Sequence, residues 1–300
     1  MNTSPSPETS RSRRRSRGRA PSERLRVLAG IVLAAILAAA YLGLDPVRFF
    51  SQVRSWKVVQ EFFGAALAPT LTSESGSGYF LLPQIWEGLH STVLFAVAGM
   101  GLALVLGTVL GFLASSAWWE GELVDASDAW TDRAVRAIGP AVTGTVRVLI
   151  AFLRSIHELL WAMLFLSAFG ISNAAAVLAI ALPYGGVLAK IFSEMLDEAP
   201  KDAALLLRSA GGGAGTVLVV GLLPRALPDI ATYAFYRFEC ALRSSAVLGF
   251  FGFPTLGYYI SASFENLYYR EVWSYLYALI LLVGVVELWS GFLRRRQEFA

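Results

Sequence analysis

The sequence has little of what disulfide frameworks and metal sites are built from. Its 300 residues contain one cysteine, Cys240, and two histidines, His90 and His157. A single cysteine excludes a disulfide framework and a thiolate-based metal site, and two histidines so far apart lack the spacing of a zinc site. We therefore expect neither a metal nor another cofactor.

Charged residues are scarce too. They make up 16% of the chain, against about 25% in an average soluble protein, while hydrophobic residues reach 56% and the mean hydropathy is +0.57. So few charges cannot cover a globule of this size with a water-compatible surface. The excess of apolar residues favours a lipid environment and argues against an ordinary soluble enzyme.

Side-chain groupings that catalyse reactions are missing as well. The chain has no paired carboxylates, no nucleophile accompanied by a base, and no glycine-rich phosphate loop followed by lysine and serine or threonine. We therefore predict no catalytic residue here, and we expect ATP hydrolysis to belong to a partner.

The N-terminal residues 1–26 carry eight arginines against Glu8 and Glu23. Their serine-, proline- and arginine-rich composition predicts a disordered basic tail. A nucleic-acid partner is one alternative, but the run has no aromatic side chain on which a base could stack. Beside an apolar segment, such a run is more typical of a membrane-topology signal.

Six stretches approach the length of about 20 apolar residues that a membrane-spanning helix needs. They lie at 27–44, 91–117, 141–169, 173–192, 231–251 and 272–292. The first could instead be a cleaved signal peptide, but it exceeds the apolar core of about 7–15 residues that such peptides have. The sequence therefore predicts an all-α membrane protein with six transmembrane helices, the first of them an uncleaved anchor.

Lysine and arginine divide unevenly between the two sides that six spans create. Seventeen fall on the side of the termini and four on the other side, which predicts that both termini are cytoplasmic. Residues 45–87 then form a periplasmic loop. Its apolar residues follow helical spacing and predict a helix in the membrane interface; they are Phe49, Val53, Trp56, Val59 and Phe63. The polar stretch 70–78 predicts a flexible connector.

Two clusters of ionisable residues interrupt the apolar spans. A charge at mid-bilayer costs about 2.5–3.5 kcal/mol, so such residues usually face a bundle interior or a watery path. The first cluster is Arg154, His157 and Glu158, and the second is Arg237, Glu239 and Arg243.

These clusters have a structural and a functional interpretation. Arg154 with Glu158, and Glu239 with Arg243, are four residues apart and could pair on one helical face. Alternatively, the surplus of guanidinium groups suits a transported anion with several oxygens. For His157 we favour a capping or hydrogen-bonding role over that of a general base.

The segment 193–229 separates the fourth and fifth spans. It predicts a helix, a glycine break at 211–213, a second helix, and a double proline stop at Pro224 and Pro228. A short helical hairpin on the cytoplasmic face is a good shape for docking into a groove of another protein. The alternative is a plain re-entrant connector.

Several runs resemble the membrane permeases of binding-protein-dependent ABC importers, specifically the phosphonate-type branch. Gly211 and the Leu-Pro pair at 223–224 have the separation found in the cytoplasmic Glu-Ala-Ala loop of those permeases. The runs Phe-Leu-Arg-Ser-Ile at 152–156, Leu-Trp-Ala at 160–162, Tyr-Arg-Phe-Glu at 236–239 and Arg-Ser-Ser-Ala-Val-Leu-Gly at 243–249 are similar to motifs of that branch.

The chain also departs from the family pattern. Three leucines at 205–207 stand where the loop has Glu-Ala-Ala, Gly221 stands at its isoleucine position, and His157 replaces a proline. The turn at 250–257 is bulkier than the family's glycine-rich turn.

The resemblance implies a permease domain at 88–296, with the helix at 27–44 an added anchor in the inner membrane. It implies cytoplasmic ATP-binding subunits, a periplasmic substrate-binding protein and a second permease subunit as partners, and no nucleic acid. The cargo would be a small oxyanion such as phosphonate or a related phosphorus compound. Another small solute, or an ATPase-independent channel or secondary transporter, is the alternative.

The resemblance and the charge pattern together predict two sets of functional residues. The predicted substrate pathway comprises Arg154, Glu158, Arg237, Glu239 and Arg243. The predicted ATPase-coupling set comprises Glu198, Asp202, Arg208, Gly211, Leu223, Pro224 and Pro228.

Overall fold

The computed structural model describes residues 21–43, 56–76, 78–119, 130–213 and 216–297. These residues are helical apart from turns and one isolated antiparallel bridge between Thr72 and Phe80. The chain divides into two compact units, Met1–Gln60 and Glu61–Ala300.

The first unit contains one long helix, α1, over Pro21–Tyr41. Residues 21–26, which were predicted as part of the disordered tail, are helical here, and proline suits the first helical position. The rest of the predicted tail lies outside the described residues. The described apolar part of α1, Leu25–Tyr41, is shorter than a usual span, so a sixth transmembrane helix stays a prediction. Helix α3, Trp56–Ala66, begins in this unit and confirms the expected helix there; Phe49 and Val53 lie outside the described residues.

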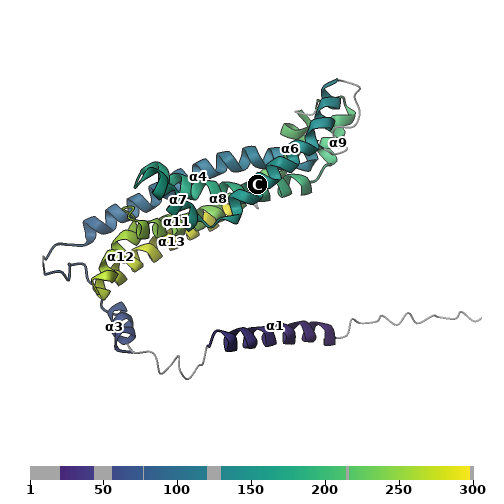
Figure 1. The fold of residues 1–300 in the computed structure, drawn as a ribbon. Coiled ribbons are helices and arrows are strands. Elements are labelled where there is room, and N and C mark those ends of the chain that lie inside the picture. Colours follow the sequence, from purple (N-terminus) through teal and green to yellow (C-terminus); the bar gives the residue numbers. More distant parts are fainter. Residues whose placement is uncertain (1–20, 44–55, 77, 120–129, 214–215, 298–300) are drawn as a thin grey trace, which may run out of the picture. The chain divides into compact units, whose positions relative to one another are not determined.

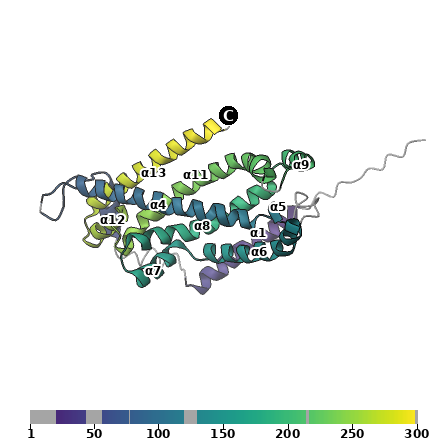
Figure 2. The ribbon, with the colours of Figure 1, turned by 90° about the horizontal axis from the view of Figure 1, so that it is seen from above.

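The second unit is a bundle whose helices α4, α8 and α11 run side by side (Figures 1 and 2). Helices α9 and α12 lie at its opposite ends, and we call the end that carries α9 the coupling end. The elements in chain order are α4 Leu82–Ala114, α5 Ser116–Trp119, α6 Trp130–Ser155, α7 Glu158–Phe169, α8 Asn173–Glu198, α9 Asp202–Ser209, η1 Val217–Leu222, α11 Leu223–Val247, η2 Leu248–Phe251, α12 Leu256–Glu265 and α13 Tyr269–Gln297.

Five helical stretches of the described chain are long and apolar enough to cross a membrane. They are Leu82–Ala114, Ile138–Ser155, Asn173–Glu198, Val217–Phe251 and Tyr269–Leu293. They correspond to the second to sixth predicted spans, which confirms an all-α membrane fold.

The third predicted span is wrong as a single helix. Helix α6 ends at Ser155 and α7 starts at Glu158. Between them His157 has an extended backbone, and its Nδ1 accepts a 3.3 Å hydrogen bond from the Leu159 N–H. The predicted capping role of His157 is thus confirmed, and this cap is the physical reason for the break.

Helix α8 forms the centre of the bundle because small residues let α4 approach it closely. On α4, Gly99, Ala103, Gly107 and Gly111 recur every fourth position and are buried. A Cβ atom on Gly107 would lie 2.6 Å from the Cβ of Leu188, and one on Gly99 would lie 2.8 Å from the Cβ of Ile180. Such small-residue stripes allow close helix contact in membranes.

The stretch 70–78 was expected to be a flexible connector, and this expectation is wrong. Its described residues are tied to α13 by Glu271, which is 3% exposed and accepts hydrogen bonds from the Ser73 Oγ and the Glu74 N–H. The Ser274 Oγ also donates to the Thr70 carbonyl. A polar composition did not predict this order because the partners lie about 200 residues away in sequence.

The predicted double proline stop is also wrong. Pro224 lies in the first turn of α11 and Pro228 lies inside it, and the helix continues to Val247. Proline is tolerated in the first turn of a helix, where backbone N–H groups have no helical partner anyway, and this accounts for Pro224. Pro228, the sixth residue of α11, removes one hydrogen bond of the helix without ending it. The wider π-helical turn η1 comes directly before Pro224.

Candidate functional site

Two arginines from different helices line one cavity in the bundle. This cavity has a volume of about 360 Å³ and is lined by Arg154, Ser155, Val187, Ile191, Tyr233 and Arg237. We call it the arginine cavity. Arg154 comes from the last turn of α6, Val187 and Ile191 from α8, and Tyr233 and Arg237 from α11.

The guanidinium of Arg237 is held by two tyrosines. Its Nε–H donates a 2.9 Å hydrogen bond to the Tyr233 phenol oxygen, and its Cζ lies 5.5 Å from the Tyr233 ring centroid and 6.0 Å from that of Tyr184. Both ring distances are within cation–π range. The bond to Tyr233 uses one of the five N–H donors of the guanidinium, so it orients the group without consuming its capacity to bind an anion.

The arginine cavity is suited to a multi-oxygen anion. Its lining includes two guanidinium groups and no carboxylate. A guanidinium can donate two parallel hydrogen bonds to neighbouring oxygens of one anion. The sequence had placed Arg154 and Arg237 in separate clusters, and the fold brings them to the same cavity.

The predicted helical pair of Arg154 and Glu158 is wrong, because the two residues belong to different helices. The Glu158 Oε1 instead accepts a 2.9 Å hydrogen bond from the Ser244 Oγ, which lies 2.8 Å from the Tyr184 phenol oxygen. The His157 Nε2 lies 3.6 Å from the other carboxylate oxygen of Glu158. This chain of contacts links the start of α7 to α8 and α11.

The other two residues of the second charged cluster lie on a different face of α11 from Arg237. Glu239 and Arg243 follow Arg237 by two and six positions, which corresponds to rotations of about 200° and 240° around the helix. Glu239 is 6% exposed, and Arg243 is exposed. Neither belongs to the lining of the arginine cavity, so their predicted place in a substrate pathway stays a prediction.

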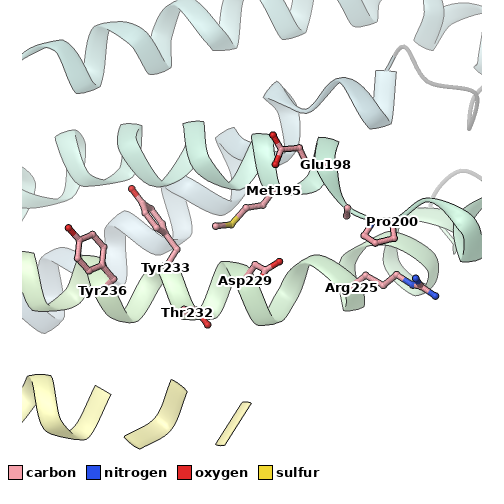
Figure 3. A pocket seen from close by; sticks show the side chains of 9 residues that line it. Met195, Glu198, Pro200, Arg225, Asp229, Thr232, Tyr233 and Tyr236 are labelled. Atoms are coloured by element: carbon pink, nitrogen blue, oxygen red, sulfur yellow. The ribbon is translucent and has the colours of Figure 1, made fainter. Parts of the chain in front are cut away.

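A larger cavity lies next to the arginine cavity, toward the coupling end. It has a volume of about 600 Å³, and we call it the vestibule (Figure 3). Tyr233 lines both cavities. The vestibule is lined by Met195, Glu198, Ala199, Pro200, Arg225, Asp229, Thr232, Tyr233 and Tyr236.

A third cavity, of about 310 Å³, adjoins the arginine cavity through Arg154. It also contains Arg147 and the Lys190–Glu194 ion pair. Asp197 lies in its wall and accepts hydrogen bonds from the Ser115 Oγ at 2.6 Å and the Ala117 N–H at 2.9 Å. Asp197 therefore fastens the last turn of α8 to the junction of α4 and α5.

The predicted coupling residues gather at the coupling end, in α9, the following turn and the start of α11. Asp202 opens α9. Gly211, with φ +86°, lies in the turn that follows it, and the Gly212 N–H donates to the Leu207 carbonyl, a pattern that terminates helices at a left-handed glycine. Leu223, Pro224 and Pro228 lie in α11. The side chain of Arg208 lies outside the described residues.

Close packing explains one departure from the family pattern. A Cβ atom on Gly221 would lie 2.9 Å from the Cα of Ala204, so the missing side chain lets η1 lie directly against α9. The leucines at 205–207 are partly exposed, with Leu206 at 70% and Leu205 at 37%. The coupling end thus presents apolar side chains where the family has a carboxylate.

Sequence reasoning missed Tyr233 and Tyr184. Tyr233 could have been found, since it precedes Arg237 by four residues and therefore shares its helical face. No local signal pointed to Tyr184, because its neighbours Arg237 and Ser244 are far away in sequence. Among the described residues, His, Cys, Asp and Glu do not gather in groups of three or more that could hold a metal ion.

Comparison with protein families gives a match over residues 134–298, to the family described as "Binding-protein-dependent transport system inner membrane component". The phosphite transport system permease protein PtxC of Stutzerimonas stutzeri is 31% identical over 274 residues, which is 90% of this chain and 86% of that protein. The phosphate-import permease protein PhnE of Mycolicibacterium smegmatis is 29% identical over 204 residues, which is 68% of this chain and 35% of that protein.

Solved structures show the same fold. An inward-facing conformation of the MetNI methionine ABC transporter aligns with a TM-score of 0.60 at 18% identity, covering 72% of this chain and 97% of that chain. An amino acid ABC transporter with histidines aligns with a TM-score of 0.54 at 16% identity, covering 72% of this chain and 94% of that chain.

Proposed function

Since the chain belongs to the family of binding-protein-dependent transport system inner membrane components, we propose that it conducts a small phosphorus oxyanion and that Arg154 and Arg237 bind this anion on its way. The resemblance to phosphonate-type permeases is confirmed. The chain is a permease subunit of an ABC importer, and its role is transport. The solute and the binding residues are the proposal.

One observation carries this proposal: two guanidinium groups from two helices line the arginine cavity. Phosphite, phosphonates and phosphate are compact tetrahedral anions whose oxygens match the paired donors of a guanidinium. The names of the relatives point to the same chemistry, since PtxC is a phosphite permease and PhnE of M. smegmatis a phosphate-import permease. Glu158, Glu239 and Arg243 complete the proposed pathway.

The proposed topology follows from the distribution of basic residues. Both termini lie in the cytoplasm, residues 27–44 anchor the chain, residues 45–87 face the periplasm, and residues 88–296 form the permease domain. The coupling end is then cytoplasmic. The vestibule opens toward the cytoplasm, and α12 lies toward the periplasm.

The proposed partners are cytoplasmic ATP-binding subunits, a periplasmic substrate-binding protein and a second permease subunit. The ATP-binding subunit contacts the segment from Glu198 to Pro228. The exposed Leu206 favours an apolar groove on that subunit, because the family's loop carboxylate is absent from this chain.

The proposed mechanism is alternating access. Nucleotide-driven closure of the ATP-binding subunits moves α9, and the packing of α9 on η1 transmits this movement to α11, which carries Arg237. Arg154 belongs to α6, so a shift of α11 changes whether both guanidinium groups reach one anion. This change supplies the difference in affinity between the two orientations that coupling requires.

Transport by the complete assembly tests the proposal. The permease is reconstituted in proteoliposomes with its ATP-binding and substrate-binding partners, and ATP-dependent uptake of labelled phosphite is measured against unlabelled phosphite, methylphosphonate, phosphate, sulfate and methionine. We expect ATP-dependent uptake of labelled phosphite. Unlabelled phosphorus oxyanions should suppress this uptake, and methionine should not.

Two outcomes would overturn the proposal. If a different class of solute is taken up and phosphorus oxyanions are not, the chain is still an importer permease, but the proposed solute is wrong. Flux through this chain alone, without ATP or partners, would instead identify a channel or secondary transporter.

A further inference from the structure

The vestibule places negative charge between the arginine cavity and the coupling end. We propose that Glu198 and Asp229 weaken the hold of the open vestibule on anions, so that anions on the ATPase side do not reoccupy the arginine cavity. These two carboxylates would therefore determine release and product inhibition. This inference rests on the proposed function, because it assumes that the cargo is an anion.

The two carboxylates come from helices that face each other. Glu198 is the last residue of α8, and Asp229 lies in the second turn of α11; both are exposed and line the vestibule. In Figure 3, Tyr233 and Tyr236 lie at one end of the vestibule, and Arg225 and Pro200 lie at the other. Glu198 and Asp229 lie between these ends. Both carboxylates therefore lie along the vestibule between Arg225 and Tyr233.

The charges of the two cavities are opposite in sign. The vestibule lining carries two carboxylates and one guanidinium, that of Arg225, whereas the arginine cavity carries two guanidinium groups and no carboxylate in its lining. Tyr233, which binds Arg237, stands where the cavities meet. A released anion therefore moves from a cationic site through an anionic passage.

The separation is short enough for the carboxylates to act on the bound anion. Asp229 and Arg237 are eight residues apart on α11, which corresponds to a rise of about 12 Å. This exceeds the Debye length of about 8 Å at physiological salt, but low-dielectric walls focus the field in such a cavity and reduce screening. The repulsion doubles for a dianion relative to a monoanion. Phosphate dianions are therefore repelled more strongly than singly charged cargo.

Inhibition by enclosed phosphate tests this inference. The complete transporter is reconstituted with its ATP-binding side facing the vesicle lumen, ATP and increasing inorganic phosphate are enclosed, and uptake of labelled phosphite from outside is measured. The variants are Asp229→Asn, Glu198→Gln and the double variant. Each is compared with itself without phosphate, so a change in its basal uptake cancels. Glu265→Gln, an exposed carboxylate of α12 at the opposite end, is the matched control.

We expect the phosphate concentration for half inhibition to fall about threefold to tenfold in Asp229→Asn and further in the double variant. The control should behave as the wild type. Raising the ionic strength from about 0.01 M to about 0.15 M shortens the Debye length from about 30 Å to about 8 Å. The half-inhibitory phosphate concentrations of variant and wild type should therefore become more similar.

Three outcomes would overturn the inference. Half inhibition within twofold of the wild type in all three variants would show that the carboxylates do not repel anions. A change in the half-inhibitory phosphate concentration that does not depend on salt would indicate a local structural role of the carboxylates instead. Absence of uptake of any phosphorus oxyanion by the wild type would refute the proposed function itself, and this inference with it.

Discussion

The Nε–H of Arg237 donates a 2.9 Å hydrogen bond to the phenol oxygen of Tyr233, one helical turn earlier on α11. This bond holds a guanidinium at the boundary between the arginine cavity and the vestibule. It depends on one helix and survives any rigid-body movement of α11. The guanidinium of Arg237, which we propose binds the anion, therefore moves together with α11 when the coupling end moves that helix.

Replacing Tyr233 with phenylalanine should weaken anion binding without abolishing transport. A hydrogen bond to a charged group contributes about 1.5–3 kcal/mol, so we expect KM for phosphite uptake to rise by roughly tenfold to a hundredfold while kcat changes little. Tyr236→Phe, which removes a neighbouring phenol of the vestibule, is the control and should leave KM near the wild-type value. Equal KM values for the two variants would contradict the positioning role of Tyr233.

Arg237→Lys should reproduce much of the Tyr233→Phe defect. Lysine keeps the positive charge but lacks the planar fork and the Nε–H. In a double-mutant cycle on KM, Tyr233→Phe should therefore add little in the Arg237→Lys background. Full additivity of the two effects would mean that Tyr233 acts independently of Arg237.

Gly107→Ala should destabilise the bundle. The new Cβ would lie 2.6 Å from the Cβ of Leu188, and overpacking of this kind costs about 1–3 kcal/mol. Gly101→Ala, on a face of α4 away from this helix contact and with no atom within 4 Å of its Cβ position, is the matched control. Thermal unfolding in detergent should show a lower Tm for Gly107→Ala only, and equal Tm values would refute the close packing of α4 on α8.

Gly211→Ala should impair coupling more than binding. The φ of +86° at this position is strained for any residue with a Cβ, at a cost of about 1–2 kcal/mol. We expect substrate-stimulated ATP hydrolysis to fall severalfold while phosphite KM is kept. Gly213→Ala, where the Cβ position is open and the backbone is not left-handed, should retain stimulation. A loss in both variants would point to a general sensitivity of the turn.

Leu206→Ser should weaken attachment of the ATP-binding subunit. Its side chain is 70% exposed, and truncating an apolar anchor of an interface costs about 1–2 kcal/mol, which is roughly a tenfold loss of affinity. Leu82→Ser, an exposed leucine at 64% at the start of α4 and outside the proposed contact segment, is the comparison and should leave the attachment unchanged. Co-purification of the partner at wild-type yield with Leu206→Ser would contradict an apolar docking contact.

The sequence predicted the parts of the fold that local patterns determine. Continuous apolar runs located the spanning helices, and the glycine break at 211–213 contains the positive φ of Gly211. The cap at His157 was predicted because no nucleophile or set of metal ligands accompanies this residue. The spacing of four between Gly99, Ala103, Gly107 and Gly111 was also visible, and it would have identified the face of α4 that meets α8.

The rest depended on contacts between distant residues. The polar residues before Glu158 indicated an interruption of the third span, but not that its two parts are separate helices, and no local pattern showed that one helix continues through Pro224 and Pro228. The order of residues 70–76 comes from Glu271 and Ser274 of α13. The arginine cavity joins residues of α6, α8 and α11, so no single segment of sequence could have predicted it.

ATP-dependent phosphite uptake by Arg154→Gln and Arg237→Gln in the complete assembly tests the central claim most directly. We predict that each variant loses at least tenfold of its uptake at subsaturating phosphite while the ATP-binding partner stays bound, and that Lys57→Gln, an exposed lysine of α3, transports normally. Wild-type uptake by both arginine variants would contradict the account.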